Sequence, residues 1–210
     1  MLKVLDMAHS LLAQVIEPGD VVVDATMGNG YDTLFLANLA AEVFAFDVQE
    51  AALSATEKRV LAAGKSVTKI LTEAENLLTQ SNQGLTDSEK MLTDLSVKLI
   101  LSGHENVAKF VQKPIKAAIF NLGYLPKADK NVITKGETTL AALTALTEKL
   151  VIGGRIAIMI YYGHEGGESE KNAVLSWVSA LAQKQWNVFS FAALNQIHQP
   201  PILVVLEKRC

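Results

Sequence analysis

The sequence has almost no cysteine, no long apolar run and no excess of positive charge. Its only cysteine is the last residue, Cys210, which excludes an internal disulfide and a cysteine-based zinc site. No stretch approaches the roughly 18 uninterrupted apolar residues of a membrane span, and the first residues lack the pattern of a secretion signal. We therefore expect a cytoplasmic protein without a membrane partner. No residue cluster has the spacing of metal ligands, so we expect no metal.

The net charge of −3 disfavours a protein that coats nucleic acid by bulk electrostatics, although it leaves room for a local basic patch. Lysines concentrate between the third and fifth predicted strands, at Lys113, Lys116, Lys127, Lys130 and Lys135. They could contact phosphates or be ordinary solvated side chains.

The 210 residues suit one α/β domain in which strands and helices alternate. The predicted strands run from Val21 to Asp24, Glu42 to Asp47, Val97 to Ser102, Ala117 to Asn121, Arg155 to Tyr161, Asn187 to Leu194 and Ile202 to Glu207. This alternation predicts a mostly parallel, seven-stranded, Rossmann-like sheet with helices on both faces. The short connection at residues 195–201 predicts that the last two strands form an antiparallel pair. Apolar residues at helical spacing before Pro18 predict an opening helix.

One connection is too long for a single crossover helix. After a predicted helix from Glu50 to Ala63, residues 65–96 form what we interpret as a helical insertion at the sheet edge. Its pattern predicts helices from Thr68 to Leu78 and from Asp87 to Leu95. The insertion could be a cap, a substrate-facing lid or a homodimer contact, and we expect one domain over residues 1–210.

A glycine turn follows the first predicted strand, in the run Asp24-Ala-Thr-Met-Gly-Asn-Gly-Tyr-Asp-Thr33. Gly28 and Gly30 allow a tight turn and a close approach of the backbone to a ligand, and a helix start follows. A dinucleotide site would need a third glycine, but Thr33 stands at that position. The turn therefore predicts a nucleotide cofactor other than a dinucleotide.

S-adenosylmethionine fits the acidic residues that end the first two predicted strands. A carboxylate at Asp47 can accept both ribose hydroxyls, while Asp24 or Asp32 can face the cofactor's cationic amino group. Alternatively, these aspartates are only a helix N-cap and a solvated strand end. We take the cofactor-binding candidates to be Asp24, Thr26, Gly28, Asn29, Gly30, Asp32, Thr33, Asp47, Gln49, Ser102 and His104, with His104 and Glu105 bordering the adenine.

Candidate catalytic residues follow two later strands. Asn121 ends a strand and Tyr124 follows three residues later, an arrangement that can hold an amine and stack a base. His164, in a glycine-rich loop, is the preferred base because an alkylamine must lose a proton before it can accept a methyl group. Alternatively, Asn121 forms a plain turn and His164 bonds only within its loop. We interpret His9, on the opening helix, as a packing residue.

Four segments together resemble one family. They are Asp24 to Thr33, Asn121-Leu-Gly-Tyr-Leu-Pro126, Tyr162-Gly-His-Glu-Gly-Gly167 and Asn195 to Pro201. In this order they are similar to the rRNA methylase family, whose characterised members methylate tRNA. The resemblance implies a class I S-adenosylmethionine-dependent enzyme that methylates 5-aminomethyl-2-thiouridine at the tRNA wobble position, giving the 5-methylaminomethyl form.

The sequence departs from the family pattern at Tyr31, where histidine is common, at Lys127-Ala128, which replaces two glycines, and at His198, where asparagine is usual. The same catalytic residues would also serve an rRNA or small-molecule methyltransferase. A non-catalytic binding module and an NAD-dependent dehydrogenase are further alternatives.

Overall fold

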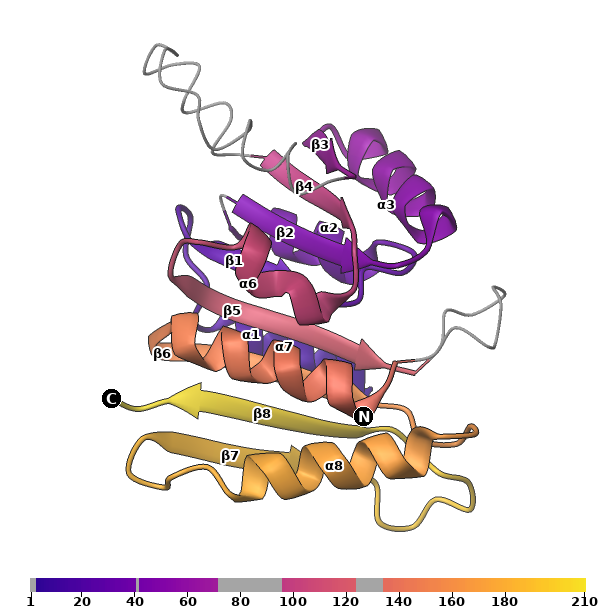
Figure 1. Ribbon diagram of the computed structural model, residues 1–210, viewed down its shortest axis with the longest axis vertical. Helices are drawn as coiled ribbons and strands as arrows, with labels where there is room; N and C mark the ends of the chain where they lie inside the picture. Colours follow the sequence, from indigo (N-terminus) through magenta and orange to yellow (C-terminus); the bar gives the residue numbers. More distant parts are fainter. Residues whose placement is uncertain (1–2, 41, 72–95, 124–133) are drawn as a thin grey trace.

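The computed structural model describes residues 3–40, 42–71, 96–123 and 134–210 and shows one sheet covered by helices on both faces (Figure 1). The strands are β1 (Val21–Asp24), β2 (Glu42–Asp47), β3 (Ser66–Ile70), β4 (Ser96–Leu101), β5 (Ile115–Leu122), β6 (Leu150–Ile160), β7 (Trp186–Phe191) and β8 (Ile202–Lys208). The helices are α1 (Val4–Ala13), α2 (Tyr31–Ala37), α3 (Glu50–Ala62), the 3-10 turn η1 (His104–Asn106), α6 (Val107–Phe110), α7 (Gly136–Lys149) and α8 (Gly167–Ser179).

The described strands lie in the order β3-β4-β2-β1-β5-β6-β8-β7. All neighbours from β3 to β6 are parallel, whereas β8 runs antiparallel to both β6 and β7. This confirms the predicted parallel sheet and its antiparallel C-terminal pair. The chain leaves β1 toward β2 on one side and later returns to β5 on the other. The strand order therefore reverses its direction at β1. A ligand site is expected beyond the carboxyl ends of the strands at such a point.

The core has two halves because successive strand residues point to opposite faces. Val22 and Ile119 pack with residues of α1, α2 and α3. Their neighbours Val23 and Phe120 pack with residues of α6, α7 and α8. Figure 1 shows the second group of helices in front of the sheet and α1 behind it. The helical spacing of the opening segment is confirmed by α1, which buries Ala8 and Leu12.

The predicted strand count of seven is wrong, because Ser66–Ile70 forms an eighth strand, β3, at the edge of the sheet. Thr68 was expected to begin a helix, but it pairs with Lys98 of β4 in a parallel ladder. Within β3 only Ile70 is fully buried, so the strand lacks the apolar run that marks the other strands. The residues of β3 have only a weak local preference for a strand, and backbone hydrogen bonds to β4 stabilise it. The rest of the predicted insertion, residues 72–95, lies outside the described residues.

Candidate active site

The glycine turn after β1 is shaped by two residues with positive φ, Gly28 at 47° and Gly30 at 77°. A Cβ atom added at Gly30 would lie 2.8 Å from the Cα of Thr56 on α3, so only glycine fits there. The Thr56 hydroxyl donates to the Gly28 carbonyl at 3.1 Å. The turn is therefore held firmly against α3, and its outer edge faces a cavity of about 530 Å³.

Asp24 anchors the start of this turn from inside the protein. Its carboxylate accepts the Thr26 backbone N–H at 3.1 Å and the Thr33 hydroxyl at 2.6 Å. Burial, followed by the nearby charge of Asp32, raises the pKa of Asp24 to about 7. The side chain is completely buried, so Asp24 stabilises the turn and Asp32 is the carboxylate that reaches the cavity.

Asp47 ends β2 and faces the same cavity. One carboxylate oxygen accepts the Gly28 N–H at 3.1 Å and the other accepts the Gln49 N–H at 3.0 Å. Burial raises the pKa of this carboxyl group, while these backbone hydrogen bonds oppose the rise. The side chain thus joins the glycine turn to the end of β2, and its remaining lone pairs can accept hydroxyl hydrogens.

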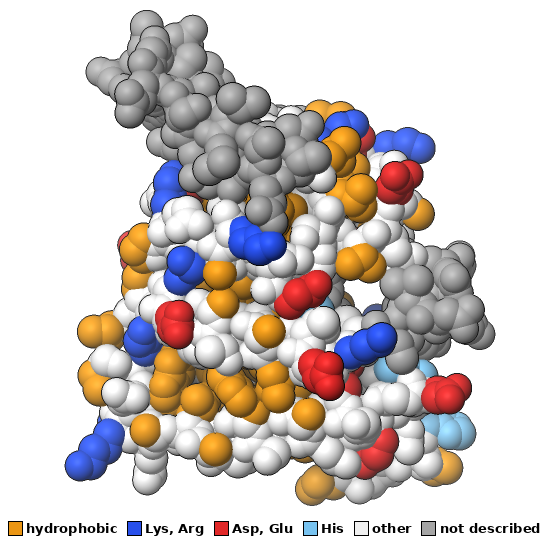
Figure 2. Space-filling view, in the orientation of Figure 1, with side chains coloured by type: hydrophobic (Ala, Val, Ile, Leu, Met, Phe, Trp, Pro, Cys, Tyr) orange, Lys and Arg blue, Asp and Glu red, His pale blue; other side chains and the backbone are white. Residues whose placement is uncertain are grey.

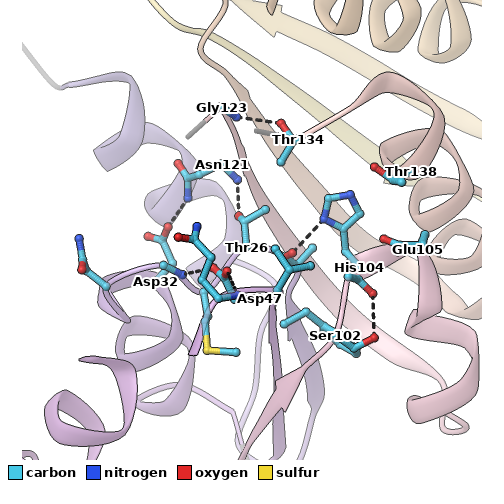
Figure 3. A pocket seen from close by; sticks show the side chains of 18 of the residues that line it. Thr26, Asp32, Asp47, Ser102, His104, Glu105, Asn121, Gly123, Thr134 and Thr138 are labelled. Carbon is cyan, nitrogen blue, oxygen red and sulfur yellow. Dashed lines mark hydrogen bonds between the residues drawn. The ribbon is translucent and has the colours of Figure 1, made fainter. Parts of the chain in front are cut away.

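Asn121, near the end of β5, connects to the turn through two hydrogen bonds. Its backbone N–H donates to the Thr26 hydroxyl at 2.7 Å, and its side-chain nitrogen donates to Asp32. Figure 3 shows the amide nitrogen directed at Asp32. Because an amide carries its oxygen opposite its nitrogen, the Asn121 carbonyl points away from Asp32.

On its far side, the cavity is closed by His104 and the loop after β4. The His104 Nδ1 lies 3.2 Å from the Ala25 carbonyl, and since a carbonyl only accepts, Nδ1 donates. Burial lowers the pKa of His104, which favours the neutral ring. Ser102 accepts a hydrogen bond from Asn106 at 3.2 Å. His104 and Glu105 both line the cavity, and their place beside the adenine stays a prediction.

A second cavity of about 460 Å³ adjoins the first. It is lined by Asn121, Leu122, Gly123, Tyr161, Tyr162, Gly163, His164 and Gln199, so Asn121 and Gly123 line both cavities. The His164 Nδ1 lies 2.9 Å from the Glu165 carbonyl and must donate to it, which in the neutral ring leaves the lone pair on Nε2. Burial and the charge of Asp32 raise the pKa of Tyr161, whose phenol stays protonated.

The structure places most of the predicted cofactor residues on the first cavity. Those that line it are Thr26, Gly28, Asn29, Asp32, Asp47, Gln49, Ser102 and His104. Asp24, Gly30 and Thr33 support the turn from behind. Tyr124 lies outside the described residues, as do Lys127 and Lys130. Of the other predicted lysines, Lys135 lines the first cavity and Lys113 forms an ion pair with Glu42 at 2.8 Å.

Two residues next to the cavities were not predicted from the sequence as site residues. Glu170 on α8 is buried and accepts hydroxyl hydrogens from Thr134 at 2.6 Å and Thr139 at 2.7 Å, and Gly123 donates to Thr134 at 2.9 Å. His9 is more than a packing residue, because its Nε2 lies 2.5 Å from an oxygen of Asp32. Neither side chain follows a strand or belongs to a motif, so only the tertiary structure reveals its role.

Comparison with known proteins decides the family. The family model described as "Putative rRNA methylase" matches residues 43–207. The chain belongs to this family. A chloroplastic tRNA (mnm(5)s(2)U34)-methyltransferase of Arabidopsis thaliana is 32% identical over 217 residues, which cover 99% of this chain and 70% of the relative.

Two solved structures are similar over nearly the whole chain. A Streptococcus mutans protein described as "a putative methyltransferase", solved in complex with SAH (S-adenosylhomocysteine), is 42% identical, with a TM-score of 0.80 and 99% of each chain covered. An rRNA methylase of Streptococcus thermophilus is 44% identical, with a TM-score of 0.76, and the match covers 100% of this chain and 99% of the other. The fold is thus Rossmann-like, and the protein is an S-adenosylmethionine-dependent methyltransferase. This outcome decides against the dehydrogenase and the non-catalytic module.

The first cavity fits this cofactor. Its volume lies within the roughly 300–1,000 Å³ of small-molecule sites. Both carboxylates line the cavity, so Asp47 would hold the ribose hydroxyls and Asp32 would offer a negative charge to the amino group. Gly28 and Gly30, with positive φ, would allow the backbone of the turn to approach the cofactor closely. Among the residues that the structure describes, no group of three or more His, Cys, Asp or Glu side chains could hold a metal ion. No helix in the described ranges could cross a membrane.

Proposed function

We propose that this methyltransferase acts on an amine of RNA, the 5-aminomethyl group of 2-thiouridine at the wobble position of tRNA, and produces 5-methylaminomethyl-2-thiouridine. The observation that carries the proposal is the place of Asn121, which lines both cavities. A donor in the first cavity and an acceptor in the second would meet at this residue. The Arabidopsis relative is named for the same modification.

Asn121 suits an amine acceptor because of the direction of its amide. Its nitrogen is held by Asp32, which leaves the carbonyl oxygen to accept a hydrogen from the substrate. A hydrogen bond of this kind limits the directions in which the lone pair of the amine can point. S-adenosylmethionine supplies a methyl group on a positively charged sulfur, which a neutral amine can take without acid catalysis.

The amine must first be neutral, and His164 can take its proton. His164 lines the second cavity, and histidine is the side chain that most often serves as a general base. Tyr161 is an aromatic wall of that cavity and is 40% exposed, so a pyrimidine can stack on it. Tyr124 remains our proposal for a second stacking residue.

RNA binding is expected to depend on local contacts. On the face shown in Figure 2, positive and negative side chains of the described residues are interspersed. Lys135 lies at the first cavity, where it can reach a phosphate, and we propose Lys127 and Lys130 for the same task. Lys113 is paired with Glu42 instead.

The substrate is tested with labelled S-adenosylmethionine and separate pools of tRNA, rRNA and small alkylamines. We expect label in tRNA alone, and mass spectrometry should place it in the wobble uridine. In a deletion strain, 5-methylaminomethyl-2-thiouridine should disappear and its aminomethyl precursor should accumulate. Unchanged wobble uridine would contradict the tRNA assignment, and label in rRNA or small amines would replace it with that substrate.

Asn121→Ala tests the role of the shared residue. The variant should bind SAH normally by calorimetry while its turnover falls by about 100-fold or more, since an unpositioned amine loses the advantage of orientation. Asn38→Ala, at an exposed position after α2, is the matched control and should keep full activity. Full activity of Asn121→Ala would refute its catalytic role.

A further inference from the structure

His9 lies on α1 and contacts Asp32, a residue that lines the first cavity. Its Nε2 is 2.5 Å from the Oδ1 of Asp32, and because a carboxylate only accepts, the ring nitrogen carries the hydrogen. The two side chains are largely shielded, with 24% of His9 and 9% of Asp32 exposed. Shielding from water makes such a charge-assisted hydrogen bond strong and directional.

The other oxygen of Asp32 receives the side-chain nitrogen of Asn121. His9, Asp32 and Asn121 thus form a continuous chain across α1, α2 and β5. The orientation of the carboxylate is fixed by its bond to His9. A rotated Asp32 would release the Asn121 nitrogen, and the amide could then turn its nitrogen toward the second cavity, where an amine also offers hydrogens.

His9 is itself held in place. Its ring stacks on Phe35 of α2 with the centroids 3.9 Å apart and the planes 7° from parallel. The helix that carries it is fixed by buried Ala8 and Leu12, and Arg155 of β6 donates to the Leu11 carbonyl at 2.7 Å. The histidine is therefore a rigid support for Asp32.

We infer that His9 is a positioning residue for methyl transfer: by fixing Asp32 it keeps the Asn121 carbonyl directed at the acceptor amine. This inference rests on the proposed amine acceptor. His9 lines neither cavity, so it acts on the substrate only through Asp32 and Asn121. Its loss is expected to lower turnover at saturating cofactor, and because Asp32 also lines the first cavity, it should weaken cofactor binding as well.

Two substitutions separate the hydrogen bond from the ring stacking. His9→Phe keeps an aromatic ring on Phe35 but loses the donor, whereas His9→Gln keeps an N–H near the position of Nε2 but loses the ring. We expect kcat of His9→Phe to fall about tenfold, the effect of one charge-assisted hydrogen bond. His9→Gln should recover most of kcat, which is measured at saturating S-adenosylmethionine so that a change in cofactor affinity does not affect the comparison. Equal kcat in wild type and His9→Phe, or a loss in His9→Gln as large as in His9→Phe, would overturn the inference.

A spectroscopic measurement tests the chain of contacts without activity. In protein labelled with ¹⁵N-asparagine, the Asn121 side-chain signal is identified by its loss in Asn121→Ala. It should move strongly in His9→Phe and stay close to its wild-type position in His9→Gln. If the signal does not move in His9→Phe, His9 does not position Asn121. If the Asn121 signal moves as expected but no RNA amine is methylated, the proposed function is wrong. The positioning of Asn121 by His9 is then still supported.

Discussion

The carboxyl group of Asp24 is fully buried, and burial together with the charge of Asp32 raises its pKa from 3.8 to about 7. Between these values the folded protein holds a proton that the unfolded chain releases. The stabilisation that this proton gives is complete below about pH 4 and is lost as the pH rises to about 7. Each pH unit in this window can remove up to about 1.4 kcal/mol.

Asp24→Asn should therefore change the pH dependence of stability. The amide has nearly the same shape and can still accept the Thr26 N–H, but it does not titrate. We expect the free energy of unfolding of the wild type to fall relative to the variant from about pH 4 to about pH 7 and then to stay parallel. Urea unfolding of both proteins at several pH values measures this difference. Parallel curves across the whole range would show that Asp24 is ionised in the fold.

His164 gives a prediction about rate. If it removes the proton from the amine, His164→Ala should lower kcat by about 100-fold near neutral pH. The loss should shrink as the pH approaches the pKa of an alkylamine, roughly 10, because more of the substrate is then already neutral. Initial rates from pH 6 to pH 9.5 measure this, with His198→Ala, at an exposed position, as the control. A loss that is the same at every pH would assign His164 a binding role.

At the scale of single residues, the sequence predicted which polar side chains near the ends of strands belong to the site. This was possible because the carboxyl ends of parallel strands meet at one edge of the sheet. Asp32, Asp47, Asn121 and His104 all lie on the first cavity as a result. His9 and Glu170 could not be predicted in this way. Each comes from a helix whose position over the site depends on packing of the whole core.

Among the elements, the glycine turn packs tightly against α3. Gly30 and Gly64 have nearly equal φ angles, 77° and 74°. A Cβ atom added at Gly30 would collide with Thr56 of α3, whereas one added at Gly64 would meet nothing within 4 Å. Gly64→Ala should cost about 1 kcal/mol from backbone strain alone. Gly30→Ala adds a Cβ that would lie 2.8 Å from the Thr56 Cα, so it should cost about 2 kcal/mol more.

Urea unfolding of the two glycine variants measures this difference, and calorimetry with SAH measures its effect on the site. Gly30→Ala should also weaken SAH binding, since the turn must move away from α3, while Gly64→Ala should bind normally. Equal costs in the two variants would mean that α3 yields easily and that the turn is held by other contacts.

The elements also show where local sequence patterns fail. The strands of the sheet interior were predicted within a few residues because both of their faces are apolar. The edge strand β3 was missed because Thr68 and Lys69 give it no apolar run. Its existence depends on the ladder with β4, a partner more than twenty residues away along the chain.

For the whole molecule, cofactor binding should appear as stability. SAH at 100 times its Kd should stabilise the fold by about 2.7 kcal/mol. For a chain of this length that raises Tm by roughly 5–10 °C. Asp47→Ala should lose most of the shift, because the ribose then lacks its acceptor, whereas Glu148→Ala, exposed on α7, should keep it. Thermal unfolding with and without SAH decides the point, and a full shift in Asp47→Ala would contradict the assigned role of Asp47.

The wall between the two cavities has a practical consequence. Because Asn121 and Gly123 line both, the two spaces are separated by little more than the end of one strand. A single compound that joins an adenosyl group to an aminomethyl pyrimidine through a short tether would fill both spaces at once. Such a bisubstrate inhibitor would combine two binding energies in one molecule, and its selectivity would come from the second half, since many enzymes bind the first.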